Sequence, residues 1–144
     1  MDIKIRKATY TDIKDIKKIL SFFFLDTDNV EKNLAEFIVA QNDLKILGCA
    51  CLDVGNIVEL RSIAILPAYR NKGIGSKLVK TILERAKELT DVIFLRTTSP
   101  VFFEKKGFVR LENNDKKVVW KDCEECNKFD ICRQTMMKKD LSIK

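Results

Sequence analysis

The chain of 144 residues contains no histidine, and this absence excludes several kinds of chemistry at once. Without an imidazole there is no histidine-based catalytic triad, no histidine metal ligand and no histidine proton shuttle. Glycine and proline are scarce, at five and two residues, so a cluster of glycines is informative. The longest apolar runs, such as SFFFL at 21–25, are far too short to span a membrane, and we expect no membrane association.

Charged and apolar side chains, in contrast, are plentiful. A content of 33% charged and 46% hydrophobic residues predicts a globular protein, with one domain over residues 1–144. Residues 113–144 are less regular and are expected to form a cysteine-containing C-terminal segment of that domain. The net charge of +6 favours an anionic partner, such as a nucleotide cofactor, a nucleic acid or an acidic metabolite. The start, MDIKIRKATY, lacks an apolar signal core, so we expect the protein in the cytoplasm.

Hydrophobic periodicity predicts an α/β protein with a mixed sheet. We expect strands at 3–8, 36–41, 45–54, 57–66, 91–96, 107–112 and 134–141. We expect helices at 10–24, 29–34, 74–89 and 99–106. Thr9 and Asp12 have the spacing of a capping box at the start of the first helix. Antiparallel hairpins therefore lead into one strand–helix–strand unit, 57–96, whose two strands should be parallel.

Two of the five glycines lie in PAYRNKGIGSKL, residues 67–78, between a predicted strand and a predicted helix. The start of a helix offers unpaired N–H groups and the positive end of its dipole, so it favours an anion, and Arg70 and Lys72 add positive charge. An ordinary glycine turn is the alternative for so short a motif. The stretch lacks the GxxxxGK[ST] pattern of a phosphate-binding loop. Position 78, where a dinucleotide fingerprint needs glycine, is leucine.

The same stretch resembles motif A of the GNAT superfamily of acetyl-CoA-dependent N-acyltransferases, [QR]xxGxG[AG], as Arg70-Asn-Lys-Gly73-Ile-Gly75-Ser76. IAILPAYR, directly before it, is similar to the strand and exit of that family. FFEKKGF at 102–108 is similar to its later aromatic and Gly-Phe signature. The resemblance covers residues 3–112 and implies the GNAT fold and an acetyltransferase activity.

The resemblance also implies a site for acetyl-CoA as co-substrate. The backbone of Ile63, Ala64 and Ile65 would hydrogen-bond the pantetheine arm as an added strand would. The diphosphate would be held by the turn and the helix start, helped by the cationic side chains there. The residues implied are Arg70, Asn71, Lys72, Gly73, Ile74, Gly75 and Ser76.

Glu59 is the candidate general base, since it lies on the strand that leads into motif A, where many members of the family place a glutamate. The alternative is a Glu59–Arg61 ion pair on a solvated strand face. The family often has a tyrosine as the acid for the leaving thiolate, but Phe103 stands there and cannot donate a proton. With no histidine to activate Cys49 or Cys51, we expect direct transfer without an acyl-cysteine.

Three further cysteines, Cys123, Cys126 and Cys132, are spaced C-x2-C-x5-C in the C-terminal segment. A CxxC pair is one half of a zinc site, but the set lacks a fourth ligand. Reduced thiols or a disulfide are the alternatives. We therefore assign no metal, and these three cysteines are the candidates if one binds.

The segment VWKDCxxCxxFxxC at 119–132, together with FFEKKGF, resembles short single-domain amino-acid N-acetyltransferases related to N-acetylglutamate synthase. This resemblance implies acetyl transfer to a small amino acid, L-glutamate, at the entry to arginine synthesis. A dianionic amino acid needs cations, and Arg6 and Arg61 are the candidates to bind it. Surface ion pairs are the alternative for each of them.

Two other functions stay open. One is a GNAT enzyme acting on protein N-termini or lysines, which a basic surface disfavours for basic peptides. The other is a non-catalytic module that binds acetyl-CoA or nucleic acid through a zinc knuckle in the tail. Because the tail has few aromatic residues besides Trp120 and Phe129, we expect no nucleic-acid partner. The expected partner is a small-molecule amine, and a homodimer stays open.

Overall fold

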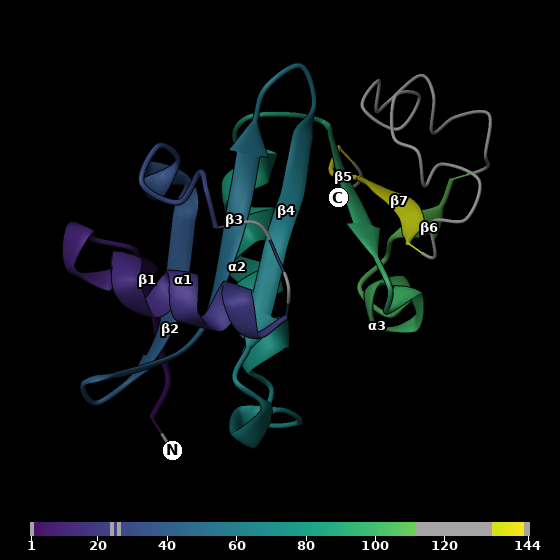
Figure 1. Cartoon of the computed structure of the whole chain (residues 1–144). Coiled ribbons are helices and arrows are strands. Elements are labelled where there is room, and N and C mark those ends of the chain that lie inside the picture. The colour runs from purple at the N-terminus through teal and green to yellow at the C-terminus, as the bar shows by residue number, and fades with distance from the viewer. Residues whose placement is uncertain (1, 24, 26, 112–133, 143–144) are drawn as a thin grey trace.

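The computed structural model describes residues 2–23, 25, 27–111 and 134–142. Within these residues seven strands form one mixed sheet in the order β1-β2-β3-β4-β5-β7-β6 (Figure 1). The strands are β1 (Lys4–Lys7), β2 (Phe37–Asn42), β3 (Lys45–Val54), β4 (Val58–Ile65), β5 (Val92–Thr97), β6 (Val109–Arg110) and β7 (Thr135–Asp140). The helices are α1 (Ile13–Phe22), α2 (Ile74–Lys87) and α3 (Pro100–Glu104), with 3₁₀ turns η1 (Tyr10–Asp12), η2 (Leu34–Glu36) and η3 (Pro67–Tyr69).

The predicted α/β class and mixed sheet are confirmed. β4 and β5 pair in parallel, as the strand–helix–strand unit requires, and the other neighbouring strands pair antiparallel. The strand expected at 134–141 is β7, which lies between β5 and β6. The sequence predicts a last strand there but does not say where in the sheet this strand pairs.

Helices cover both faces of the sheet, and Figure 1 shows α1 in front of it and α2 behind. Five α2 residues, Ile74, Leu78, Val79, Ile82 and Ala86, are buried against one face. Three α1 residues, Ile16, Ile19 and Leu20, are buried against the other. Burial of apolar side chains on both faces gives the central strands their stability.

The helices differ in three places from those predicted from the sequence. The helix expected at 10–24 begins as η1 and continues as α1, with the predicted Thr9–Asp12 capping box at its start. No helix forms at 29–34. Hydrogen-bonded turns run to residue 33 and lead into η2, because an isolated turn of so few residues does not propagate. α2 ends at Lys87, so Leu89 is 53% exposed.

A β-bulge bends β4 just before motif A. Cys51 of β3 pairs with Ser62 and Leu52 pairs with Leu60, which leaves Arg61 as the extra residue of β4. Such a bulge bends the strand and changes its twist. β4 pairs with β5 only at Glu59 and Leu60 in the ladder described, and the two strands then diverge toward the bottom of Figure 1. The fork between them positions the candidate site.

No helix in the described part of the chain is long and apolar enough to cross a membrane.

Candidate active site

Glu59 lies at the point where β4 and β5 begin to separate. Its carboxylate accepts a hydrogen bond from Arg96 Nε of β5, 3.1 Å from Oε2, and its Oε1 is 3.7 Å from Arg61 Nη1. The residue is only 3% exposed. The ion pair with Arg61 therefore exists, but the solvated strand face expected as the alternative setting is wrong. A carboxylate here can accept a proton and is held in place by two guanidinium groups.

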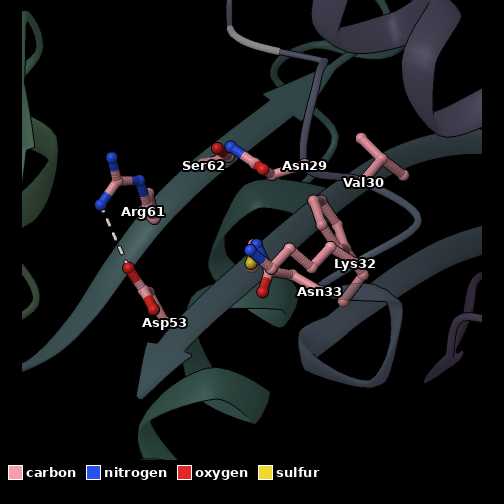
Figure 2. A pocket seen from close by; sticks show the side chains of 9 residues that line it. Asn29, Val30, Lys32, Asn33, Asp53, Arg61 and Ser62 are labelled. Atoms are coloured by element: carbon pink, nitrogen blue, oxygen red, sulfur yellow. Dashed lines mark hydrogen bonds and ion pairs between the residues drawn. The ribbon is translucent and has the colours of Figure 1, made fainter. Parts of the chain in front are cut away.

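A pocket of about 290 Å³ opens on the same face of the sheet as Glu59. Asp53 of β3 pairs directly with Glu59 of β4, so both side chains point to one face. The pocket is lined by Asn29, Val30, Lys32, Asn33, Phe37, Cys51, Asp53, Arg61 and Ser62. Figure 2 shows Arg61 turned toward Asp53, with the Asn29, Lys32 and Asn33 side chains contributed from the segment before β2.

The polar lining suits a small charged molecule. Arg61 Nη1 is 3.1 Å from Asp53 Oδ2, and half of the Arg61 side chain is exposed, so it can reach a second anion. Lys32 supplies a second cation, and Asn29 and Asn33 supply amides that both donate and accept. The sequence predicts Arg61 here. It does not predict Lys32 or the two asparagines. They belong to the polar segment between α1 and β2, which lies next to β3 and β4 only in the folded protein.

Among the residues that the structure describes, the backbone of β4 beyond the bulge is paired on one side only. Ile63, Ala64 and Ile65 pair with residues of β3, while the ladder with β5 ends at Leu60. An extended molecule can add to such a strand edge through backbone hydrogen bonds. This is the geometry that the predicted pantetheine site requires.

The motif A turn connects β4 to α2 through two left-handed residues. Asn71 has φ of 62° and Gly73, the N-cap of α2, has φ of 80°. A Cβ at Gly73 would meet no atom of the described residues within 4 Å, so the backbone beside it is open toward them. The first turn of α2 contains no acidic residue. Its unpaired N–H groups thus remain suited to an anion.

Gly75 has a packing reason for its small size. A Cβ there would lie 3.1 Å from Ile65 Cδ1 and 3.4 Å from the Phe102 ring. The glycine lets the start of α2 pack closely on β4 and α3, in addition to any role toward a phosphate. Ser76 Oγ accepts a hydrogen bond from Lys106 Nζ at 2.7 Å, which the sequence did not predict.

Two predicted cations are engaged elsewhere. The Arg70 guanidinium lies over the Phe23 ring, 4.8 Å from its centre. Arg6 donates two hydrogen bonds to Asp12 and one to Gln41. Arg6 lies on β1, with β2 and β3 between it and β4, and it is not among the described residues that line the pocket containing Arg61. Its role toward a substrate stays a prediction.

The remaining predictions concern Phe103, which stands where the family often has an acidic tyrosine, and the thiols of Cys49 and Cys51. Phe103 is buried and packs on Phe102 and Phe108, at 5.0 and 5.7 Å between ring centres. Burial raises the pKa of both Cys49 and Cys51 to about 12, so neither thiol ionises near neutral pH. This environment agrees with direct transfer.

Cys123, Cys126 and Cys132 lie outside the described residues. Within those residues, no three cysteine, aspartate or glutamate side chains gather as a metal site would require.

The family model described as "Acetyltransferase (GNAT) domain" matches residues 33–110, more than half of the chain. The chain belongs to the GNAT acetyltransferase family. Membership confirms the predicted fold and makes the protein an acyltransferase, of the class whose co-substrate is acetyl-CoA.

Relatives with assigned names point in the same direction. An amino-acid acetyltransferase of Mycobacterium tuberculosis is 31% identical over 140 residues, covering 88% of this chain and 79% of the relative. An uncharacterized N-acetyltransferase of Chlorobaculum tepidum is 28% identical over 151 residues, covering 97% of each protein. An amino-acid acetyltransferase of Aeromonas salmonicida is 34% identical over an alignment of 93 residues that covers 61% of this chain and 21% of that longer protein.

Solved structures share the fold at low identity. N-acetylglutamate synthase from Neisseria gonorrhoeae, complexed with coenzyme A and N-acetyl-glutamate, has a TM-score of 0.85 at 19% identity. The match covers 98% of this chain and 35% of the synthase. Rv2747 from Mycobacterium tuberculosis, in complex with CoA and NLQ, has a TM-score of 0.78 at 24% identity, covering 95% of this chain and 98% of that one.

Proposed function

We propose that the protein transfers the acetyl group of acetyl-CoA directly to the amine of a small amino acid, and that L-glutamate is the preferred acceptor. The observation that carries the proposal is the pocket in which Arg61 and Lys32 lie on the same face of the sheet as Glu59. Two cations suit the two carboxylates of glutamate, and the carboxylate of Glu59 is available to receive the amine proton.

The co-substrate would bind along the edge of β4 that β5 leaves unpaired. The backbone of Ile63 to Ile65 would hold the pantetheine arm, and the N-terminus of α2 with its turn, Arg70 to Ser76, would hold the diphosphate. Lys72 is exposed in that turn and can meet the negative charge. In this arrangement the thioester end of the arm points up the fork toward Glu59.

In the transfer step, the lone pair of the neutral amine attacks the thioester carbonyl carbon. A new C–N bond forms, the C–S bond breaks, and the sulfur leaves with the electron pair as a thiolate. The proton lost by the amine goes to Glu59, directly or through water. Phe103 has no proton to give. Either the thiolate leaves unprotonated, which a thiol pKa of about 8.5 permits, or another group supplies the proton.

Two relatives support the choice of acceptor. The Mycobacterium tuberculosis protein that is 31% identical is named an amino-acid acetyltransferase. The Neisseria synthase with the same fold was solved with N-acetyl-glutamate bound. By this analogy the enzyme would stand at the entry to arginine synthesis. We further propose that residues 1–144 form one domain and act in the cytoplasm, where acetyl-CoA and free amino acids are found.

Thiol release from acetyl-CoA, measured across the amino acids and a set of peptides, tests the proposal. Glutamate should give the highest kcat/KM, and mass spectrometry should identify N-acetylglutamate as the product. Faster acetylation of peptide N-termini or lysines would replace the proposed acceptor with a protein. If the protein binds acetyl-CoA but acetylates no amine, the alternative of a non-catalytic acetyl-CoA-binding module would replace the proposed enzyme.

A further inference from the structure

The segment at 27–36 forms one wall of the pocket but contains little regular structure. It contributes Asn29, Val30, Lys32 and Asn33, four of the nine lining residues. Its internal backbone hydrogen bonds are isolated turns: Val30 N to Thr27 O, Asn33 N to Asn29 O and Glu36 N to Asn33 O. A wall built from single turns keeps its position only if side chains tie it to the rest of the fold.

Tertiary contacts fix this segment near its start and at its end. Val30 is 1% exposed and packs into the core on the α1 side of the sheet. At the other end, Arg85 Nη2 donates a hydrogen bond to the carbonyl oxygen of Ala35 at 3.1 Å and lies 3.5 Å from Glu36 Oε2. Arg85 belongs to the last turn of α2, fifty residues away from Ala35 in the sequence.

This Arg85–Glu36 contact differs from an ordinary surface ion pair. In the part of the chain that the structure describes, the buried atoms Arg85 Nη1 and Glu36 Oε2 have no hydrogen bond. The 3.5 Å contact with Arg85 Nη2 is then the compensation for Glu36 Oε2, and removing Arg85 leaves this buried oxygen without a cation. The charges of Glu36 and Arg85 also influence Cys51, one of the residues that line the pocket. The nearby Glu36 carboxylate raises the pKa of Cys51 and the Arg85 guanidinium lowers it, on top of the larger effect of burial.

We propose that Arg85 is a positioning residue for the acceptor: it ties the pocket wall to α2 and so sets the affinity for the amino acid. The inference rests on the proposed function, since it takes this pocket as the acceptor site. The same helix begins at the turn that would hold the diphosphate, so one rigid element supports both substrate sites.

Steady-state kinetics of Arg85→Ala test this role. The KM for the amino acid should rise about 5- to 30-fold, while kcat and the KM for acetyl-CoA change little. Arg85→Lys should restore part of the loss, because an ammonium can still reach Glu36 or Ala35 O. Arg110→Ala is the matched control. It removes an arginine that bonds Glu104 on the exposed surface and touches no pocket residue, so its kinetics should equal wild type. An unchanged acceptor KM in Arg85→Ala overturns the proposal.

Hydrogen exchange gives a readout that needs no turnover. In Arg85→Ala the amides of 27–36 should exchange faster, while those of β3 and β4 keep their protection. Equal exchange in wild type and variant overturns the role of Arg85 as an anchor. A wild-type enzyme that acetylates no amino acid overturns the proposed function instead. In that case the hydrogen-exchange result alone decides whether Arg85 holds residues 27–36 in place.

Discussion

The carboxylate of Glu59 on β4 accepts a 3.1 Å hydrogen bond from Arg96 Nε on β5, beside the Glu59–Phe94 and Leu60–Leu95 pairs that join the two parallel strands. The pair joins residues 37 positions apart in the sequence. It places the candidate base at the point of the fork and holds both strands there. Glu59 therefore has a structural role in addition to the chemical one that we propose, and experiments must separate the two.

Replacing Glu59 by glutamine keeps the size of the side chain and removes the base. Turnover near neutral pH should fall by about 10²–10⁴-fold if Glu59 accepts the amine proton. Activity should recover partly at higher pH, where more of the amine is already neutral. Affinity for CoA, measured by calorimetry, should change little, because the β4 backbone beyond the bulge is untouched.

Glu104→Gln is a suitable control for that experiment, since Glu104 is an exposed acid of α3 paired with Arg110. Its activity should match wild type at every pH. Full activity in Glu59→Gln would mean that water receives the proton and that Glu59 serves only to pair with Arg96.

Gly73 offers a test of the diphosphate site. In Gly73→Glu a carboxylate enters the open space beside the N-terminus of α2, so affinity for CoA should drop by about tenfold or more. Gly73→Gln has the same size and the same cost of a left-handed φ, about 1–2 kcal/mol, without the charge. Calorimetry should find CoA binding much weaker in the glutamate variant than in the glutamine variant. Equal affinities would place the diphosphate elsewhere.

Local sequence patterns were sufficient to predict most of the sheet. An apolar run after the Asn42-Asp43 turn predicts β3 at 45–54, where the structure has it, and the strand–helix–strand pattern predicts the parallel pair. Both signals arise from contacts between near neighbours. The sequence also brings Glu59 into the β4 strand that leads to motif A, and its role as a base stays a prediction.

Contacts between residues far apart in the sequence could not be predicted from these local patterns. Lys32 enters the pocket only because its polar segment folds back over β3, and no periodicity reports such a contact. Nothing in the sequence near Arg96 indicates its ion pair with Glu59, which forms only because β5 lies beside β4 in the sheet. The helix expected at 29–34 was wrong because six residues form too few hydrogen bonds to offset the cost of starting a helix, and the segment forms single turns instead.

Asp12 predicts how stability depends on pH. Hydrogen bonds from Arg6 lower the pKa of this carboxyl below its ordinary 3.8, and the backbone N–H of Thr9 adds to the effect. The contribution to stability is therefore present above pH 3.8 and is lost as the pH falls through the lower pKa of the folded state. Asp12→Asn should cost about 1–3 kcal/mol near neutral pH.

Urea denaturation of wild type and Asp12→Asn, near neutral pH and at about pH 3, measures this effect. The gap in unfolding free energy between the two proteins should narrow at the lower pH. A gap that stays constant would show that the Arg6–Asp12 pair contributes nothing that protonation removes.

The preference for glutamate over glutamine, expressed as a ratio of kcat/KM in wild type and in Arg61→Ala, tests the central claim most directly. The two acceptors differ only in one carboxylate, and the Arg61 side chain is half exposed, so its removal should leave the fold intact. We predict that wild type prefers glutamate by about tenfold or more and that Arg61→Ala loses most of this preference through a higher KM for glutamate. A wild-type enzyme that treats the two alike, or a ratio that Arg61→Ala leaves unchanged, would contradict the account.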